Sequence, residues 1–129
     1  MQQFDIQEMI GPSVLMPGGE IDLEEAIRIS SERFPDQAFC VTDEWVWLDL
    51  DAPDLVNEEL AREGKRPVML LVFNVLFDSS VPVKTQWFRS TPLVDFSDGM
   101  FFHTSNKIYV LLGQGRRKSM SLSAVIRFF

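Results

Sequence analysis

Residues 38–50 read AFCVTDEWVWLDL, and residues 67–77 read PVMLLVFNVLF. Both stretches are rich in the β-branched and aromatic side chains that favour strands. The second stretch is hydrophobic almost throughout, which is typical of a central strand covered on both faces. Within the first stretch, residues 42–44 indicate a bend or a tight turn. Residues 38–50 are therefore either one long strand or a hairpin, and we expect a sheet at the centre of the fold.

A helix is predicted to precede the first stretch. Asp22 begins it, and Glu25 follows three residues later in an aspartate variant of the capping box. Pro35 ends it, because the residue before a proline resists the α conformation. The inward face, repeating near helical spacing, consists of Leu23, Ala26, Ile27 and Phe34.

A second helix is predicted between the two hydrophobic stretches, beginning at Asp51 or Ala52. Pro53 fits its first turn, where no backbone donor is needed. Gly64 is a plausible C-terminal cap. The expected core contacts of this helix are Leu55, Val56 and Leu60.

Short strands and a last helix are predicted to complete the fold. The strands cover residues 84–90, 100–104 and 107–112, and short connectors favour antiparallel neighbours. The last helix follows a cap at Ser119 or Ser121, and its stripe consists of Leu122, Val125, Ile126 and Phe129. The sequence therefore predicts an α+β fold, with a largely antiparallel sheet of about five strands and two or three helices packed on it.

Composition places the chain among ordinary globular proteins. Its 129 residues are 46% hydrophobic and 24% charged, which suits one domain over residues 1–129 with residues 1–20 as an N-terminal arm. No apolar stretch approaches the ~20 residues of a membrane-spanning helix. The N-terminus lacks the features of a secretory signal. One cysteine excludes an internal disulfide, so we expect a cytoplasmic location.

The formal net charge of −7 is unevenly distributed. Residues 1–63 contain 16 acidic and 3 basic side chains, whereas residues 64–129 contain 3 acidic and 9 basic ones. Such an asymmetry points to partners of opposite charge. The acidic balance of the whole chain argues against nucleic acid as the partner, because a basic domain is expected there.

The most distinctive local segment is GQGRRK at residues 113–118. We interpret it as a loop between the last strand and the last helix, with a cationic tip at Arg116, Arg117 and Lys118. Free backbone N–H groups beside cations make an anion site reasonable. The spacing of Gly113 and Gly115 matches neither a P-loop nor a dinucleotide fingerprint. Further residues suited to nucleic-acid binding are Lys84, Trp87, Arg89 and Lys107.

No motif anchors a catalytic hypothesis. Asp49 and Asp51 resemble aspartate-nucleophile phosphatases only at two carboxylates, and Asp54 stands where a calcium loop requires glycine. We interpret them as a strand end and a helix start. Cys40 is interpreted as a small core residue, and His103 as a strand residue with an ordinary hydrogen bond. The sequence therefore predicts no catalytic residue, cofactor or metal.

Trp45 and Trp47 lie on one sheet face if their strand is regular. Burial in the core is the favoured interpretation. The alternative is an exposed binding centre, where tryptophan is enriched.

Four segments together resemble a known family: residues 39–41 (FCV), 45–49 (WVWLD), 87–91 (WFRST) and 113–118. Over roughly residues 20–129 the chain is similar to small uncharacterised proteins, a domain of unknown function, from pseudomonads and their prophages. This resemblance implies a bacterial or phage accessory protein, and it carries no activity, cofactor or site residue.

The leading hypothesis is a non-enzymatic accessory module that binds a protein, such as an inhibitor or immunity protein. An acidic helical surface would face a basic partner, for example a toxin or a nucleic-acid-handling defence complex. Its acidic candidates are Glu24, Glu25, Glu32, Asp36, Glu58, Glu59 and Glu63. The alternatives are anion or nucleic-acid binding through Arg116, Arg117 and Lys118, or an enzyme of unrecognised type.

Overall fold

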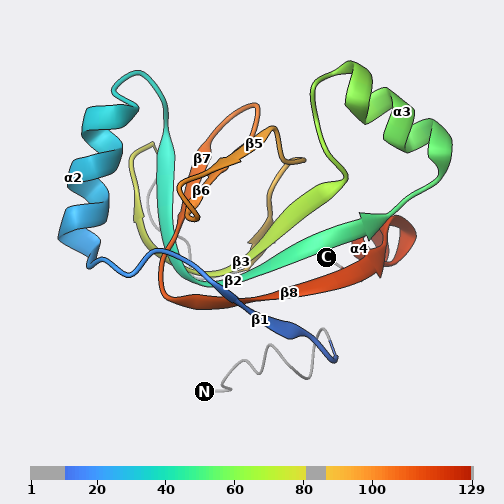
Figure 1. Cartoon of the computed structure of the whole chain (residues 1–129), viewed down its shortest axis with the longest axis horizontal. Coiled ribbons are helices and arrows are strands. Elements are labelled where there is room, and N and C mark those ends of the chain that lie inside the picture. The colour runs from blue at the N-terminus through green and yellow to red at the C-terminus, as the bar shows by residue number, and fades with distance from the viewer. Residues whose placement is uncertain (1–10, 81–86, 129) are drawn as a thin grey trace.

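The computed structural model describes residues 11–80 and 87–128, which form a curled eight-stranded sheet with three helices (Figure 1). Five of the seven strand pairings in this part of the chain are antiparallel, so the predicted α+β fold is confirmed, with more strands than expected. The helices are α2 (Leu23–Arg33), α3 (Asp54–Arg62) and α4 (Leu122–Phe128). The strands are β1 (Val14–Pro17), β2 (Phe39–Asp51), β3 (Val68–Asp78), β4 (Phe88–Arg89), β5 (Asp95–Ser97), β6 (Phe101–His103), β7 (Ile108–Leu111) and β8 (Gln114–Ser121).

Strand β2 is the axis of the sheet. β3 runs antiparallel along one edge, while β7 and then β8 pair in parallel with the first and second halves of the other edge. Register shifts between Val41 and Trp45 bend β2 at the point where β7 gives way to β8. Gly113, at φ 70°, makes the matching break between β7 and β8. The alternative left open by the sequence is thereby resolved, because residues 39–51 form one long bent strand.

The inner face of the curl holds an aromatic core. Trp45 and Trp47 are 1% and 6% exposed, which confirms their predicted burial on one face. The Trp47 ring packs edge-on against Phe96 and Phe102, with centroids 5.0 Å and 5.3 Å away. Gly115 of β8 lies so close to Trp45 that an added Cβ would come within 2.4 Å of the indole ring. The curl therefore closes around two indoles and needs glycine at that position.

Two helices cover the outer face of the sheet. α2 places Ala26 in one cluster with Val41 of β2. At the other end, α4 places Val125 in a cluster with Leu48. Since Val41 and Leu48 lie on opposite sides of the bend in β2, each helix stabilises one half of the curled sheet.

Several predicted helix ends are confirmed. The Asp22 carboxylate accepts a hydrogen bond from the Glu25 backbone N–H at 2.9 Å, and α2 ends before Pro35. Gly64 follows α3 in a left-handed conformation, with φ 72°. Ser121 begins α4, where its hydroxyl accepts a hydrogen bond from the Ala124 N–H at 3.2 Å. These ends were predictable because caps are local in sequence.

The predicted loop at residues 113–118 is wrong, because this segment lies within and just before strand β8. It is extended because β2 pairs with one of its edges and β1 with the other. Neither β1 nor β5 was predicted. The predicted strand at residues 84–90 is reduced to Phe88–Arg89 within the described residues, and residues 84–86 and 1–10 lie outside them.

Predicted core contacts of α3 and α4 are also wrong. Leu55 of α3 is 76% exposed, and Val56 and Leu60 are only partly buried and belong to no core cluster, because α3 does not lie on a sheet face. Ile126 of α4 is 59% exposed, because this short helix turns Leu122 and Val125 toward the sheet instead. Phe129, the last residue of the predicted stripe, lies outside the described residues.

Candidate functional site

The acidic residues of α2 are largely engaged within the helix. Arg28 forms ion pairs with Glu25, one turn before it, and with Glu32, one turn after it. The Glu24 carboxylate forms no hydrogen bond or ion pair within residues 11–80 and 87–128. Neither does the carboxylate of Asp36, in the turn after the helix. α2 therefore presents little uncompensated charge along its length.

Helix α3 is built differently, because none of its residues is buried. Leu55, Glu58, Glu59 and Arg62 are all exposed and follow one another at helical spacing, so they form one outward surface. We call these four residues the α3 stripe. Within the described part of the chain, neither the Glu58 nor the Glu59 carboxylate has a hydrogen-bond or ion-pair partner. The α3 stripe thus combines an exposed leucine with two unpaired carboxylates.

The position of α3 explains its exposure. It lies in the connection between β2 and β3, beyond the point where the two strands meet (Figure 1). The strand pair is closed without it, because the Leu50 N–H donates to the Pro67 carbonyl at 2.8 Å and Asp49 lies opposite Val68. The helix is therefore an elaboration of a strand connection rather than a layer on the sheet.

The predicted single acidic surface is not formed. Figure 1 shows α2 and α3 at opposite ends of the molecule. Glu24, Glu25 and Glu32 therefore lie apart from Glu58 and Glu59. Just after α3, Glu63 is paired with Lys65 at 3.3 Å. Of the predicted acidic candidates, Glu58 and Glu59 are neighbours in the fold whose carboxylates form no ion pair within the described residues.

The three cations of β8 do not form the predicted cationic tip. Arg117 lies opposite Trp47 and shares its inner face, whereas Arg116 and Lys118 lie opposite Val46 and Leu48 on the outer face. Alternation along the strand separates them because side chains have a period of two. Among the described residues, Arg116 and Lys118 have no carboxylate partner.

Arg117 is held in a compact arrangement at the rim of the inner face. Its guanidinium donates to both oxygens of Asp49, at 2.7 Å and 3.0 Å, and lies 5.2 Å from the centre of the Trp47 ring. The Trp47 indole N–H donates to Asp49 at 3.0 Å. The hydrogen bond to Asp49 raises the pKa of Arg117 above its usual value. A cation committed to these partners is not available to a phosphate.

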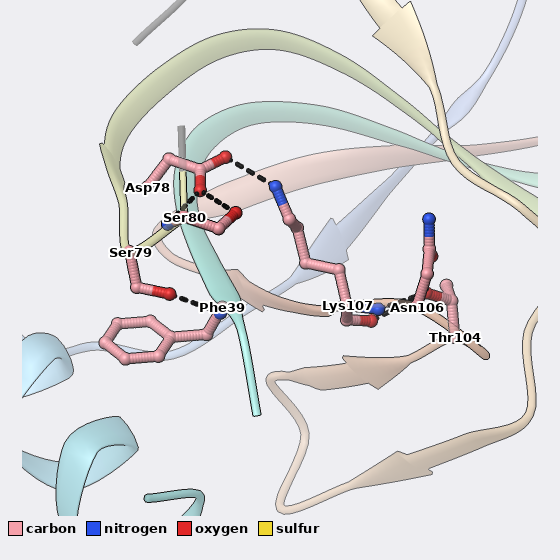
Figure 2. A network of polar contacts seen from close by, with 7 residues as sticks. All are labelled: Phe39, Asp78, Ser79, Ser80, Thr104, Asn106 and Lys107. Carbon is pink, nitrogen blue, oxygen red and sulfur yellow. Dashed lines mark hydrogen bonds and ion pairs between the residues drawn. The ribbon is translucent and has the colours of Figure 1, made fainter. Parts of the chain in front are cut away.

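A second polar network lies at the end of the sheet near α2 (Figure 2). Figure 2 shows Lys107 extending across β2 to Asp78 at the end of β3, with 2.7 Å between the charged atoms. The side chains of Lys107 and Asp78 are only 16% and 5% exposed. Burial alone would raise the pKa of Asp78, but hydrogen bonds from Lys107 and Ser80 outweigh it and hold that pKa below its ordinary value.

Cys40 lies inside this end of the sheet and is fully buried, as predicted. Burial, with a smaller contribution from the charge of Asp78, raises the pKa of its thiol to about 12. Tyr109, which pairs with Cys40 across β2 and β7, also has its pKa raised to about 12 by burial. Both groups remain protonated at neutral pH, so the thiol is not an activated nucleophile.

His103 makes the ordinary hydrogen bond that the sequence predicted, 3.1 Å from its Nε2 to the Ser97 hydroxyl. Its ring also packs edge-on against Phe34. A hollow of about 190 Å³ lies beside it, lined by residues 36–38 and 103–108. Cys40 does not line this hollow, so the hollow does not bring the thiol to the imidazole.

Within residues 11–80 and 87–128, no cluster of three or more His, Cys, Asp or Glu residues is arranged to hold a metal ion. No helix in this part of the chain is long and apolar enough to cross a membrane.

The sequence analysis missed both polar networks. Asp49 shares a strand face with Trp45 and Trp47, and an inward-facing carboxylate needs a cation nearby. That alternation predicts a basic partner without identifying Arg117. The Asp78–Lys107 pair had no comparable signal, because it joins two strand ends that are distant in sequence.

Comparison with known proteins gives a family and no activity. Neither the curated proteins nor the solved structures contain a match to the chain. One family profile matches residues 17–127, close to the extent expected from the sequence. The chain therefore belongs to the family described as a domain of unknown function, DUF6957.

Proposed function

We propose that this protein is a non-enzymatic accessory module that binds one protein partner through the α3 stripe. The observation that carries the proposal is an exposed leucine, Leu55, beside the unpaired Glu58 and Glu59 on a helix with no buried residue. Isolated helices of this length are marginal in water, so α3 gains most by packing against something else. An apolar residue ringed by charged ones is the usual anatomy of a small contact surface.

The partner has a basic surface with an apolar pocket. Glu58 and Glu59 supply the complementary charge, and the net charge of −7 steers a basic partner toward the molecule. Leu55 supplies the contact that loses its water on binding. Burial of Leu55 would contribute to the affinity, whereas the exposed carboxylates of Glu58 and Glu59 would chiefly affect the association rate and its salt dependence.

The placement of α3 supports a role outside folding. Because the Leu50–Pro67 hydrogen bond closes the β2–β3 pair, a short turn could connect the strands. A longer connection that carries its own helix is typical of a functional element. We further propose a bacterial or phage origin, a cytoplasmic location with Cys40 reduced, and a role of the inhibitor or immunity type.

Anion or nucleic-acid binding has less support as an alternative. Arg117 is committed to Asp49 and Trp47, and Lys107 to Asp78. Arg116 and Lys118 alone present uncompensated positive charge on the outer face of β8. A surface that binds a nucleic-acid backbone normally contacts more phosphates than two cations can neutralise.

The test uses two helical peptides of equal positive charge, one built from leucine and lysine and the other from alanine and lysine. Binding to the full chain is measured by calorimetry at low and physiological salt. We expect the leucine peptide to bind more tightly than the alanine peptide. The L55A variant should lower the affinity for the leucine peptide by about tenfold, a loss of about 1.4 kcal/mol. E58Q/E59Q should reduce affinity chiefly at low salt.

The matched control is E24Q, because Glu24 is the unpaired acidic residue of α2. This variant should change affinity by less than about twofold. The single variant E58Q, which removes the same charge as E24Q, completes the comparison. Equal losses of affinity in E24Q and E58Q, or equal affinity of the wild type for the two peptides, would show nonspecific attraction and overturn the proposal.

A further inference from the structure

The outermost strand of the sheet has an open edge. β1 pairs with β8 on one side, and within the described residues no strand pairs with its other side. Figure 1 shows β1 along the lower margin of the sheet, away from all three helices. Val14 and Leu15 are 63% and 58% exposed. An unpaired strand of this kind is a template for another extended chain.

The register of β1 identifies which backbone groups are open. The Gly18 N–H donates to the Gly113 carbonyl at 2.7 Å, immediately after the last β1 pair, Pro17 with Gln114. Hydrogen-bonded and non-bonded pairs alternate in an antiparallel ladder. The backbone groups of Val14 and Met16 therefore face β8, whereas those of Leu15 and of the preceding Ser13 face the open edge.

The same edge is positively charged on the outer face. Arg116 donates to the Ser13 hydroxyl at 3.1 Å, and the Lys118 ammonium to the Pro12 carbonyl at 3.2 Å. Both cations thus reach from β8 to the residues that directly precede β1. A shallow hollow of about 310 Å³, lined by residues 11–13 and Arg116, lies at this corner. Within the described chain no carboxylate neutralises either cation.

We propose that the open edge of β1 binds an extended acidic segment of a partner protein, which adds to the sheet as a further strand. Main-chain groups of Ser13 and Leu15 would bond the incoming backbone. Carboxylates on one face of that segment would meet Arg116 and Lys118 on the outer face, and the apolar residue between them would cover Val14 on the inner face. The backbone and the charges of the incoming segment would therefore both be recognised at β1.

Charge decides between an acidic segment and a second copy of this chain. Two copies joined through β1 would bring two sets of the same cations, Arg116 and Lys118, to one joined sheet, and like charges oppose that pairing. β1 itself carries no charged residue that would block its edge. Pro17 has no N–H, so recognition is confined to the few residues before it.

This site is separate from the α3 stripe and takes a segment of opposite charge. The test is amide hydrogen exchange of the full chain, followed by NMR, with a short peptide of alternating valine and glutamate. One control peptide carries lysine in place of glutamate, and another carries N-methyl groups on the residues that would pair. We expect the glutamate peptide alone to slow exchange of the Leu15 N–H, by about tenfold or more.

The double variant R116Q/K118Q should lower the affinity for the glutamate peptide by about tenfold. L55A should leave this affinity unchanged, so failure of this inference is distinguishable from failure of the α3 proposal. Equal binding of the glutamate and lysine peptides would overturn the inference. Slow exchange of the Leu15 N–H in the absence of peptide would also overturn it, because the edge would then already be covered. Sedimentation would show whether a second copy of the chain or the chain itself covers the edge.

Discussion

Helices α2 and α3 have similar charge patterns and different environments. Each is short, acidic in its first turn and basic in its last turn. α2 lies on the outer face of the sheet, where Ala26 is 1% exposed and Arg28 neutralises Glu25 and Glu32. α3 lies beyond the ends of β2 and β3, and none of its residues is fully buried. Amphipathic patterning thus identifies a helix, but the sheet behind it decides whether the helix stabilises the fold or is free to bind.

The sharpest test of this difference is a charge placed on each helix. A26D should destabilise the protein by about 4 kcal/mol or more, because it buries an unpaired carboxylate in the cluster that contains Val41. L55D should change the free energy of unfolding by no more than about 0.5 kcal/mol, because residue 55 is exposed. Urea unfolding of both variants measures this, and similar losses would mean that α3 is part of the core.

The end of the sheet near α2 also contains the buried Asp78–Lys107 pair. K107M should cost about 3 kcal/mol, because it leaves the Asp78 carboxylate buried without its cation. The double variant D78N/K107M should recover part of this loss. If K107M has wild-type stability, the pair is not buried in solution.

The same pair predicts a pH dependence. Because the folded pKa of Asp78 lies below its unfolded value, its contribution to stability is complete above the unfolded pKa and is lost as pH falls through the folded pKa. Wild type should therefore lose stability more steeply than D78N as pH falls below about 4. Urea midpoints measured across this range check the slope, and parallel curves would contradict the assignment.

The two helix starts should respond unequally to loss of an aspartate. D22A removes the acceptor of the Glu25 N–H and should cost about 1 kcal/mol. D54A removes only a favourable charge near the start of α3, where no side-chain cap exists, and should cost about 0.3 kcal/mol. Thermal unfolding of the two variants compares them, and a larger loss in D54A would show that α3 supports the fold.

Removal of α3 itself should also have little effect on stability. Replacing residues 53–64 by a short glycine-containing turn should change stability by less than about 1 kcal/mol, because the Leu50–Pro67 hydrogen bond already closes the strand pair. Peptide binding should be lost in this variant. Unfolding of the shortened chain would contradict the independence of α3 from the core.

The features that sequence predicted are local ones. Asp22, Pro35 and Gly64 mark helix ends through their own backbone chemistry, and the apolar run at residues 67–77 becomes β3. β8 was mistaken for a loop because its glycines and cations favour turns, whereas two neighbouring strands hold it extended. Leu55 was misplaced because periodicity shows which residues share a face but not what lies behind that face.

The acidic candidates do not form one surface, because local patterns do not show what surrounds each residue in the fold. The sequence selected Glu24, Glu25, Glu32, Glu58 and Glu59 by charge, but pairing and position separate them. Arg28 could be matched to Glu25 and Glu32 from their spacing alone. The distance between α2 and α3 depends on the curl of the sheet, which no local pattern encodes.

The most direct test of the central claim maps where a basic leucine–lysine peptide contacts the isotopically labelled full chain by NMR. The account predicts that amide shifts and slowed exchange gather on α3 around Leu55, Glu58 and Glu59, and that α2 is unaffected. Equal perturbation of α2 and α3, or perturbation confined to α2, would contradict it.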